Sequence, residues 1–154
     1  MSGPQTFQRL SREALEEHRQ IHFYLDQVAQ ALARLEGGIT DVEPMRRLAA
    51  QLAALKDRLQ EHHHNEESGG LFEAILEALP SRRVEIDRLA NQHERMIEIL
   101  EMARLHAKRG EVTEFDALRV DLQKFLQMFR EHEQHEEQLL TQAIGKETRE
   151  LLDS

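Results

Sequence analysis

Apolar residues recur along most of the chain at steps that alternate between three and four, which is the spacing of a buried stripe on a helix. Glycine and proline residues separate this pattern into four segments. Because the connections between the segments are short, sequential helices should lie antiparallel to one another. The pattern therefore predicts an all-α fold, an up-down-up-down antiparallel four-helix bundle. We expect the four helices to span about residues 11–36, 42–79, 82–109 and 113–144.

The bundle is expected to form a single domain over residues 1–154, which is long enough to bury a core without disulfides. A short frayed N-terminus is expected at about residues 1–9 and a C-terminal tail at about residues 146–154. Gly69 and Gly70 lie inside the second segment, and paired glycines weaken a helix. We therefore expect a kink or a brief break at that point.

The absence of cysteine excludes thiolate zinc sites, iron–sulfur clusters, cysteine nucleophiles and disulfides. Any metal must therefore bind to nitrogen and oxygen atoms. A net charge of −9 argues against nucleic acid or an anionic membrane as a partner, because both would repel the chain. No apolar stretch is long enough to span a bilayer, and the N-terminus lacks the pattern of a targeting segment. We expect a soluble, cytoplasmic protein.

Four of the nine histidines occupy positions of the apolar stripe, one in each segment. In the second and fourth segments a glutamate follows at the next inward position, which places nitrogen and oxygen donors on one face, one turn apart. Antiparallel packing should bring all these positions to one level of the bundle. Burying such groups without partners would cost roughly 2 kcal/mol or more each, and a pair of cations would satisfy them. The candidate metal ligands are His18, His62, Glu66, His93, His132 and Glu136.

The remaining histidines have simpler interpretations. A residue one position off the stripe is rotated by roughly 100° around the helix, so His63 and His64 are expected to point away from the core. His22 and His135 lie nearer the edge of the stripe, and His106 is expected to be solvated near a helix end. Any single stripe histidine could also hydrogen-bond a nearby carboxylate without binding metal. That alternative accounts less well for four such histidines on four helices, two of them followed by glutamate.

Four short motifs follow one another along the chain: Glu17-His18, His62-x-x-x-Glu66-Glu67-x-Gly-Gly, Gln92-His93 and His132-x-x-x-Glu136. In this order they resemble the hemerythrin-like, or HHE cation-binding, domain family, and the resemblance covers nearly the whole chain. It implies that the four stripe histidines are iron ligands and that Glu66 and Glu136 bridge the two irons. The implied cofactor is an oxo- or hydroxo-bridged pair of iron ions, with manganese or zinc as substitutes.

The third segment departs from the pattern of the oxygen-carrying hemerythrins. Those proteins have a second histidine one turn after the first, and this chain has Ile97 there. Three substitutes remain open: His22 as an additional ligand, Glu67 as an additional carboxylate, or an open coordination position. Of these we favour His22. A small ligand is expected to bind beside four apolar residues, Leu25, Met96, Ile97 and Phe129.

Three functions are consistent with these features. The first is a di-iron protein that binds dioxygen or a related small ligand, nitric oxide or peroxide, for sensing, storage or delivery. The second is a di-iron enzyme of oxidative-stress defence that consumes peroxide or oxidises iron. A ferritin-like site would need two Glu-x-x-His motifs, and only Glu61 with His64 provides one. The third is a structural or interaction bundle with adventitious metal. No catalytic residue is assigned, and neither a protein partner nor a homo-oligomer is indicated.

Overall fold

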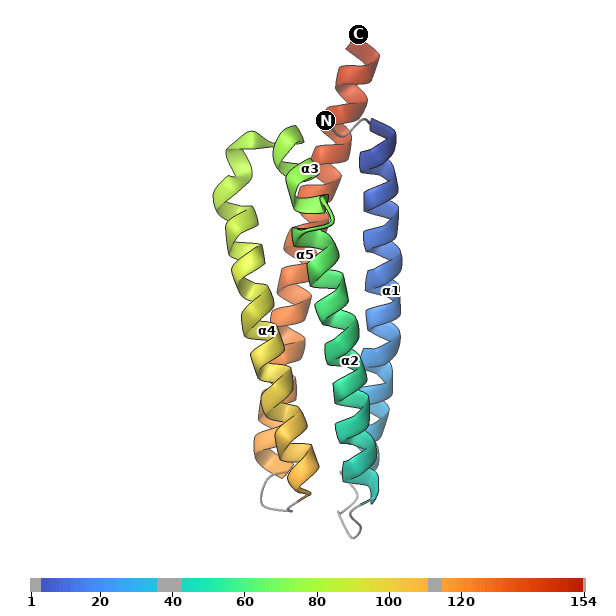
Figure 1. Cartoon of the computed structure of the whole chain (residues 1–154), viewed down its shortest axis with the longest axis vertical. Helices are drawn as coiled ribbons and strands as arrows, with labels where there is room; N and C mark the ends of the chain where they lie inside the picture. Colours follow the sequence, from blue (N-terminus) through green and yellow to red (C-terminus); the bar gives the residue numbers. More distant parts are fainter. Residues whose placement is uncertain (1–3, 36–42, 111–114, 154) are drawn as a thin grey trace.

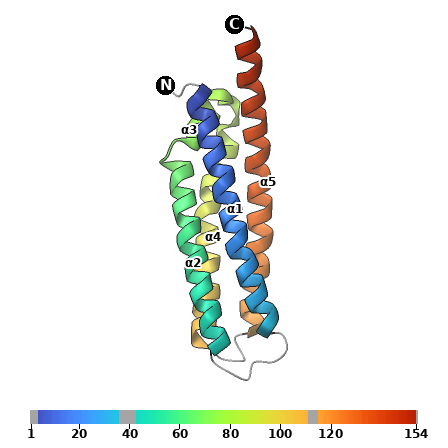
Figure 2. The same cartoon turned by 90° about the vertical axis from the view of Figure 1, so that its right-hand side faces the viewer.

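The computed structural model of the chain describes residues 4–35, 43–110 and 115–153. Four long helices run alternately in opposite directions, and the principal contacts join sequential neighbours (Figure 1, Figure 2). The predicted all-α, antiparallel four-helix bundle is confirmed. None of the described helices is long and apolar enough to cross a membrane. The elements are α1 (Pro4–Leu35), α2 (Glu43–Glu67), α3 (Leu71–Ala78), the 3-10 turn η1 (Pro80–Arg82), α4 (Arg83–Arg109) and α5 (Phe115–Asp153).

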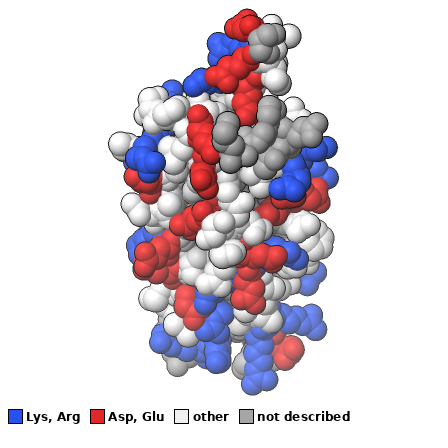
Figure 3. All heavy atoms as spheres, turned by 45° about the horizontal axis from the view of Figure 1, so that its top comes forward, with Lys and Arg blue, Asp and Glu red and all other residues white. Residues whose placement is uncertain are grey.

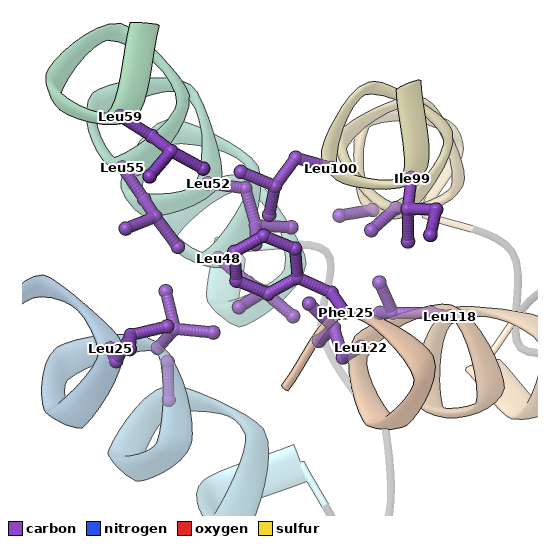
Figure 4. Close-up of a cluster of buried hydrophobic side chains, with 14 of the residues drawn as sticks. Leu25, Leu48, Leu52, Leu55, Leu59, Ile99, Leu100, Leu118, Leu122 and Phe125 are labelled. Carbon is purple, nitrogen blue, oxygen red and sulfur yellow. The ribbon is translucent and has the colours of Figure 1, made fainter. Parts of the chain in front are cut away.

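The interior contains two separate hydrophobic clusters, one toward each end of the bundle. The larger cluster joins all four long helices, and its leucine-rich centre is drawn in Figure 4. The smaller cluster includes Phe7, Phe72 and Leu139. It lies toward the end of the bundle that carries α3 (Figure 1). The labelled residues of the larger cluster are Leu25, Leu48, Leu52, Leu55, Leu59, Ile99, Leu100, Leu118, Leu122 and Phe125.

The expected break at the paired glycines is confirmed, because α2 ends at Glu67 and α3 begins at Leu71. The backbone amides of Ser68 and Gly69 both donate to the carbonyl of His64, at 2.7 and 3.2 Å. A Cβ atom at Gly69 would lie 2.4 Å from the Asn65 carbonyl oxygen, and Gly70 has a φ of +102°. Glycine is therefore required at both positions.

The helix ends differ from the sequence prediction at both termini. Helix α1 begins at Pro4 rather than near Ser11, so part of the segment expected to fray is helical. Phe7 explains the difference, because it extends the apolar stripe by two turns and is only 1% exposed. Helix α5 continues to Asp153 instead of ending near Ile144, and its last turns project beyond the other helices (Figure 1).

Acidic and basic side chains are mixed over the face of the bundle drawn in Figure 3. One ion-pair group joins α2 to α4, where Lys56 Nζ lies 2.9 Å from Glu101 Oε2 and Arg104 also donates to the Glu101 carboxylate. The hydrogen bonds from Arg104 and Lys56 lower the pKa of Glu101 to about 2. The pKa of the Glu101 carboxyl group is therefore lower in the folded chain than its ordinary value of 4.5.

We predict that Glu101→Gln lowers the free energy of unfolding at pH 7 by about 0.5 kcal/mol, the usual size for a partly exposed pair. A depressed carboxyl pKa stabilises the fold above pH 4.5, and this contribution is lost as the pH falls toward 2. Urea titrations of both proteins at pH 7 and pH 3 should therefore show a smaller difference at pH 3. Glu98→Gln is the control, because Glu98 forms its ion pair with Arg95 of its own helix, at 3.4 Å. An equal loss in both variants would contradict the prediction.

Candidate metal centre

A layer of polar side chains separates the two hydrophobic clusters. On α1, His18 lies between Ala14 of the smaller cluster and Ile21 of the larger one, and on α4, His93 lies between Leu89 and Met96. All six candidate ligands are brought into this layer, and each is at most 5% exposed. They are His18, His62, Glu66, His93, His132 and Glu136.

The inward nitrogen atoms of the four histidines form two pairs. The Nε2 atoms of His18 and His62 lie 3.1 Å apart, and those of His93 and His132 lie 3.2 Å apart. Each glutamate contacts one histidine of each pair. Glu66 Oε1 lies 3.1 Å from His62 and 3.2 Å from His93, and Glu136 lies 3.1 Å from His18 and 3.4 Å from His132. This arrangement of buried histidine and glutamate groups is consistent with a metal site.

The outward Nδ1 atoms of three histidines donate hydrogen bonds to side chains of a neighbouring helix. These bonds fix the Nδ1–H tautomer and direct the Nε2 lone pair into the layer, as outer partners do for metal-binding histidines. His18 differs, because its Nδ1 atom lies 3.9 and 3.8 Å from Glu133 and Glu137, beyond hydrogen-bonding distance. The three bonds run from His62 to Glu17 (2.8 Å), from His93 to Glu67 (3.0 Å) and from His132 to Gln92 (2.8 Å).

This hydrogen-bond pattern leaves the centre of the layer short of positive charge. In the neutral rings with Nδ1 protonated, the Nε2 atoms of His93 and His132, which lie 3.2 Å apart, both present lone pairs to the centre. Among the described residues, neither carboxylate oxygen of Glu66 or of Glu136 has a partner in hydrogen-bonding geometry. Uncompensated buried carboxylates cost several kcal/mol each, and a cation would satisfy both kinds of group. The donor set therefore fits metal ions.

The pKa shifts of the two glutamates also favour a bound cation between them. Burial, followed by the neighbouring carboxylate of Glu136, raises the pKa of Glu66 well above its ordinary value. Burial alone would also raise the pKa of Glu136, but its contacts with Glu66, His132 and His18 lower it well below that value. For Glu17, burial is likewise outweighed by the hydrogen bonds from His62 and Asn65, which lower its pKa and keep it an acceptor.

Comparison with known families agrees with this geometry. The sequence profile described as the hemerythrin HHE cation binding domain matches residues 9–144. The chain belongs to the hemerythrin HHE cation-binding family. Its buried histidine and glutamate groups are thus the candidate cation site of an HHE domain. No curated protein and no solved structure matched the chain significantly.

The two additional ligands considered from the sequence lie outside the inner group of this HHE domain. The His22 side chain is 51% exposed, and its Nε2 atom lies 2.9 and 3.0 Å from the two oxygens of Glu133. The Glu67 side chain is 44% exposed and accepts a hydrogen bond on the outward nitrogen of His93. In this arrangement Glu67 orients a ligand histidine, and His22 is paired on the surface.

Two expectations about the other histidines were wrong. His63 was expected to point away from the core, but it is only 5% exposed and stacks flat on His93. The reason is that α2 packs closely against α4, which covers a second face of α2 beside the stripe. His106 was expected to be solvated, but its side chain is 14% exposed and its Nδ1 atom lies 3.2 Å from Asp121 Oδ2 of α5. His64 is exposed, as expected.

The four apolar residues expected beside a small ligand do not line one pocket. Leu25 lines a cavity of about 120 Å³ whose walls come from α1, α2 and α5. Ile97 lines an open groove of about 1020 Å³ between α2 and α4, which also reaches His63 and His93. Met96 and Phe129 are buried in the larger cluster, where they adjoin the polar layer.

Sequence reasoning assigned no role to Glu17 or Gln92. Each immediately precedes a candidate ligand in the chain, yet each serves a histidine of the next helix. In the sequence, the position of each residue directly before a candidate ligand was the signal that it could contribute to the site. It could not show which histidine each residue would contact, because that depends on the rotation of the neighbouring helix.

We predict that Glu66→Leu stabilises the metal-free protein and reduces its metal content. Replacing a buried, repelled carboxylate by an apolar side chain should raise the free energy of unfolding by about 1–2 kcal/mol, or roughly 2–8 °C in Tm. Calorimetry after chelator treatment measures the first effect, and metal analysis should find less than half of the wild-type content. The matched control is Glu61→Leu, since the Glu61 side chain is 65% exposed on the same helix. A metal-free Glu66→Leu protein less stable than wild type would contradict this.

Proposed function

We propose that this HHE domain holds a pair of iron ions and binds dioxygen or a related small ligand, nitric oxide or peroxide, for sensing, storage or delivery. The observation that carries the proposal is the pairing of inward nitrogens. His18 with His62 and His93 with His132 form two donor pairs, and each glutamate contacts both pairs. A single cation would not account for that division.

The choice of iron rests on the chemistry of the donors. Imidazole nitrogen and carboxylate oxygen without thiolate suit iron or manganese, and zinc can also bind them. Bound iron would supply the affinity for a diatomic ligand or for peroxide. The chain itself supplies an enclosure, because Met96 and Phe129 adjoin the layer on one side and Phe72 stacks on His93 at 5.6 Å from the other cluster. Such apolar walls limit the access of water to the site.

The outer hydrogen bonds support the same proposal. Glu17, Glu67 and Gln92 each hold one histidine in the tautomer that can bind a cation. A bundle that needed these histidines only for packing would not require their inward nitrogens to be free of protons. These three residues are therefore positioning residues, which act on the site through the histidines.

We predict that Glu17→Ala weakens metal binding by about 10- to 100-fold, the usual cost of losing an outer partner of a ligand histidine. Competition with a chelator measures the affinity, and circular dichroism checks that the helices are intact. Glu16→Ala is the matched control, because the neighbouring Glu16 side chain is 52% exposed and pairs with Arg19. Equal affinities for both variants would show that Glu17 does not orient a ligand.

The proposal as a whole is tested by metal analysis of protein produced with added iron, together with its visible spectrum before and after reduction and re-exposure to air. About two irons per chain, with near-ultraviolet bands that vanish on reduction, would support the di-iron centre. A reversible return on exposure to dioxygen favours binding, whereas sustained peroxide turnover favours the enzyme alternative. Substoichiometric zinc that mild chelation removes without change in helicity would overturn the proposal.

A further inference from the structure

His63 is the one buried histidine of the described residues to which the proposed site gives no role. It follows His62 on α2 and faces α4, where its ring stacks on His93 with centroids 3.7 Å apart and planes inclined by 5°. Its ring centre lies 6.1 Å from that of His62 and 6.3 Å from that of His132. Among the candidate ligands, His63 therefore packs most closely against His93.

The nitrogen atoms of His63 are available for binding. Among the residues that the structure describes, none forms a hydrogen bond with the ring of His63, although three of its buried neighbours have outer acceptors. A neutral imidazole keeps a lone pair on one nitrogen, which is the atom that a metal ion binds. His63 also lines the groove between α2 and α4, from which its ring can be reached.

The position of His63 brings it to the candidate site. One donor atom each from His63, Glu66 and His93 lie within 4.8 Å of one another, and all three residues are buried. Ile97 of α4, where the sequence resemblance to oxygen-carrying hemerythrins would place a histidine, lines the same groove between α2 and α4 as His63. His63 on α2 and Ile97 on α4 thus flank one groove, next to His93.

We propose that His63 is a metal ligand and supplies from α2 the nitrogen that Ile97 does not supply from α4. One cation position then has His18 and His62, and the other has His93, His132 and His63, with Glu66 and Glu136 shared. This inference rests on the proposed two-ion centre and deepens it. The other candidates are placed less favourably, since His22 is bound to Glu133 and Glu67 contacts the outward nitrogen of His93.

A packing role for His63 is the competing explanation, because stacked rings also fill space. His63→Phe separates the two, since phenylalanine keeps a flat ring but offers no donor atom. We expect this variant to bind the second iron at least 10-fold more weakly in chelator competition, and X-ray absorption to show fewer imidazole nitrogens per iron. Adding Ile97→His should restore both measurements by returning a nitrogen from α4. His64→Phe, an exposed neighbour on α2, should match the wild type.

The outcomes separate this inference from the proposed function. If the wild type does not hold two irons, the two-ion centre and this inference both fail. If the wild type holds two irons and His63→Phe binds both with unchanged affinity and nitrogen coordination, only the role of His63 fails. Should His63→Phe lose helicity, His63→Gln provides the same comparison in a smaller side chain, and unchanged nitrogen coordination there would overturn the inference.

Discussion

Two glutamates buried among leucines are the constraint on which this structure depends. Glu66 and Glu136 are at most 1% exposed, and the outer hydrogen bonds of His62, His93 and His132 turn the Nε2 atoms of these three rings toward the centre. The hydrophobic clusters on either side pack the four helices together and hold the polar residues in the layer between them. A cation is the partner that satisfies both the carboxylates and the imidazoles.

The orientation of the histidines depends on contacts that pass from helix to helix. Glu17 of α1 serves His62 of α2, Glu67 of α2 serves His93 of α4, and Gln92 of α4 serves His132 of α5. Glu133 and Glu137 of α5 lie near His18 of α1 in the same way, but at longer distances. Each outer residue is a chain neighbour of one of the six candidate ligands. One short motif therefore provides both a donor for the site and support for a donor on another helix.

The fold and the six inward residues could be predicted because both depend on helical periodicity, which is a local property of the chain. The glycine break was predictable for a similar reason. The predicted ends of α1 and α5 were less accurate, because Phe7 finds its partners only across the bundle and nothing after Ile144 stops the helix. The errors at His63 and His106 have one cause. A single stripe describes a helix with one buried face, whereas α2 and α4 are covered on a second face by their neighbours.

The polar layer lies between two complete hydrophobic clusters. The bundle fold can therefore be inherited without the residues of the candidate metal site. Every inward ligand occupies a place in the helical repeat that leucine fills elsewhere, and the helix lengths and connections do not depend on which of them is present. A lineage could lose the metal through a few substitutions and retain the bundle. Descendants that share this architecture would then differ in chemistry while their overall shape stayed the same, so kinship of fold alone is a poor guide to whether a member still binds metal.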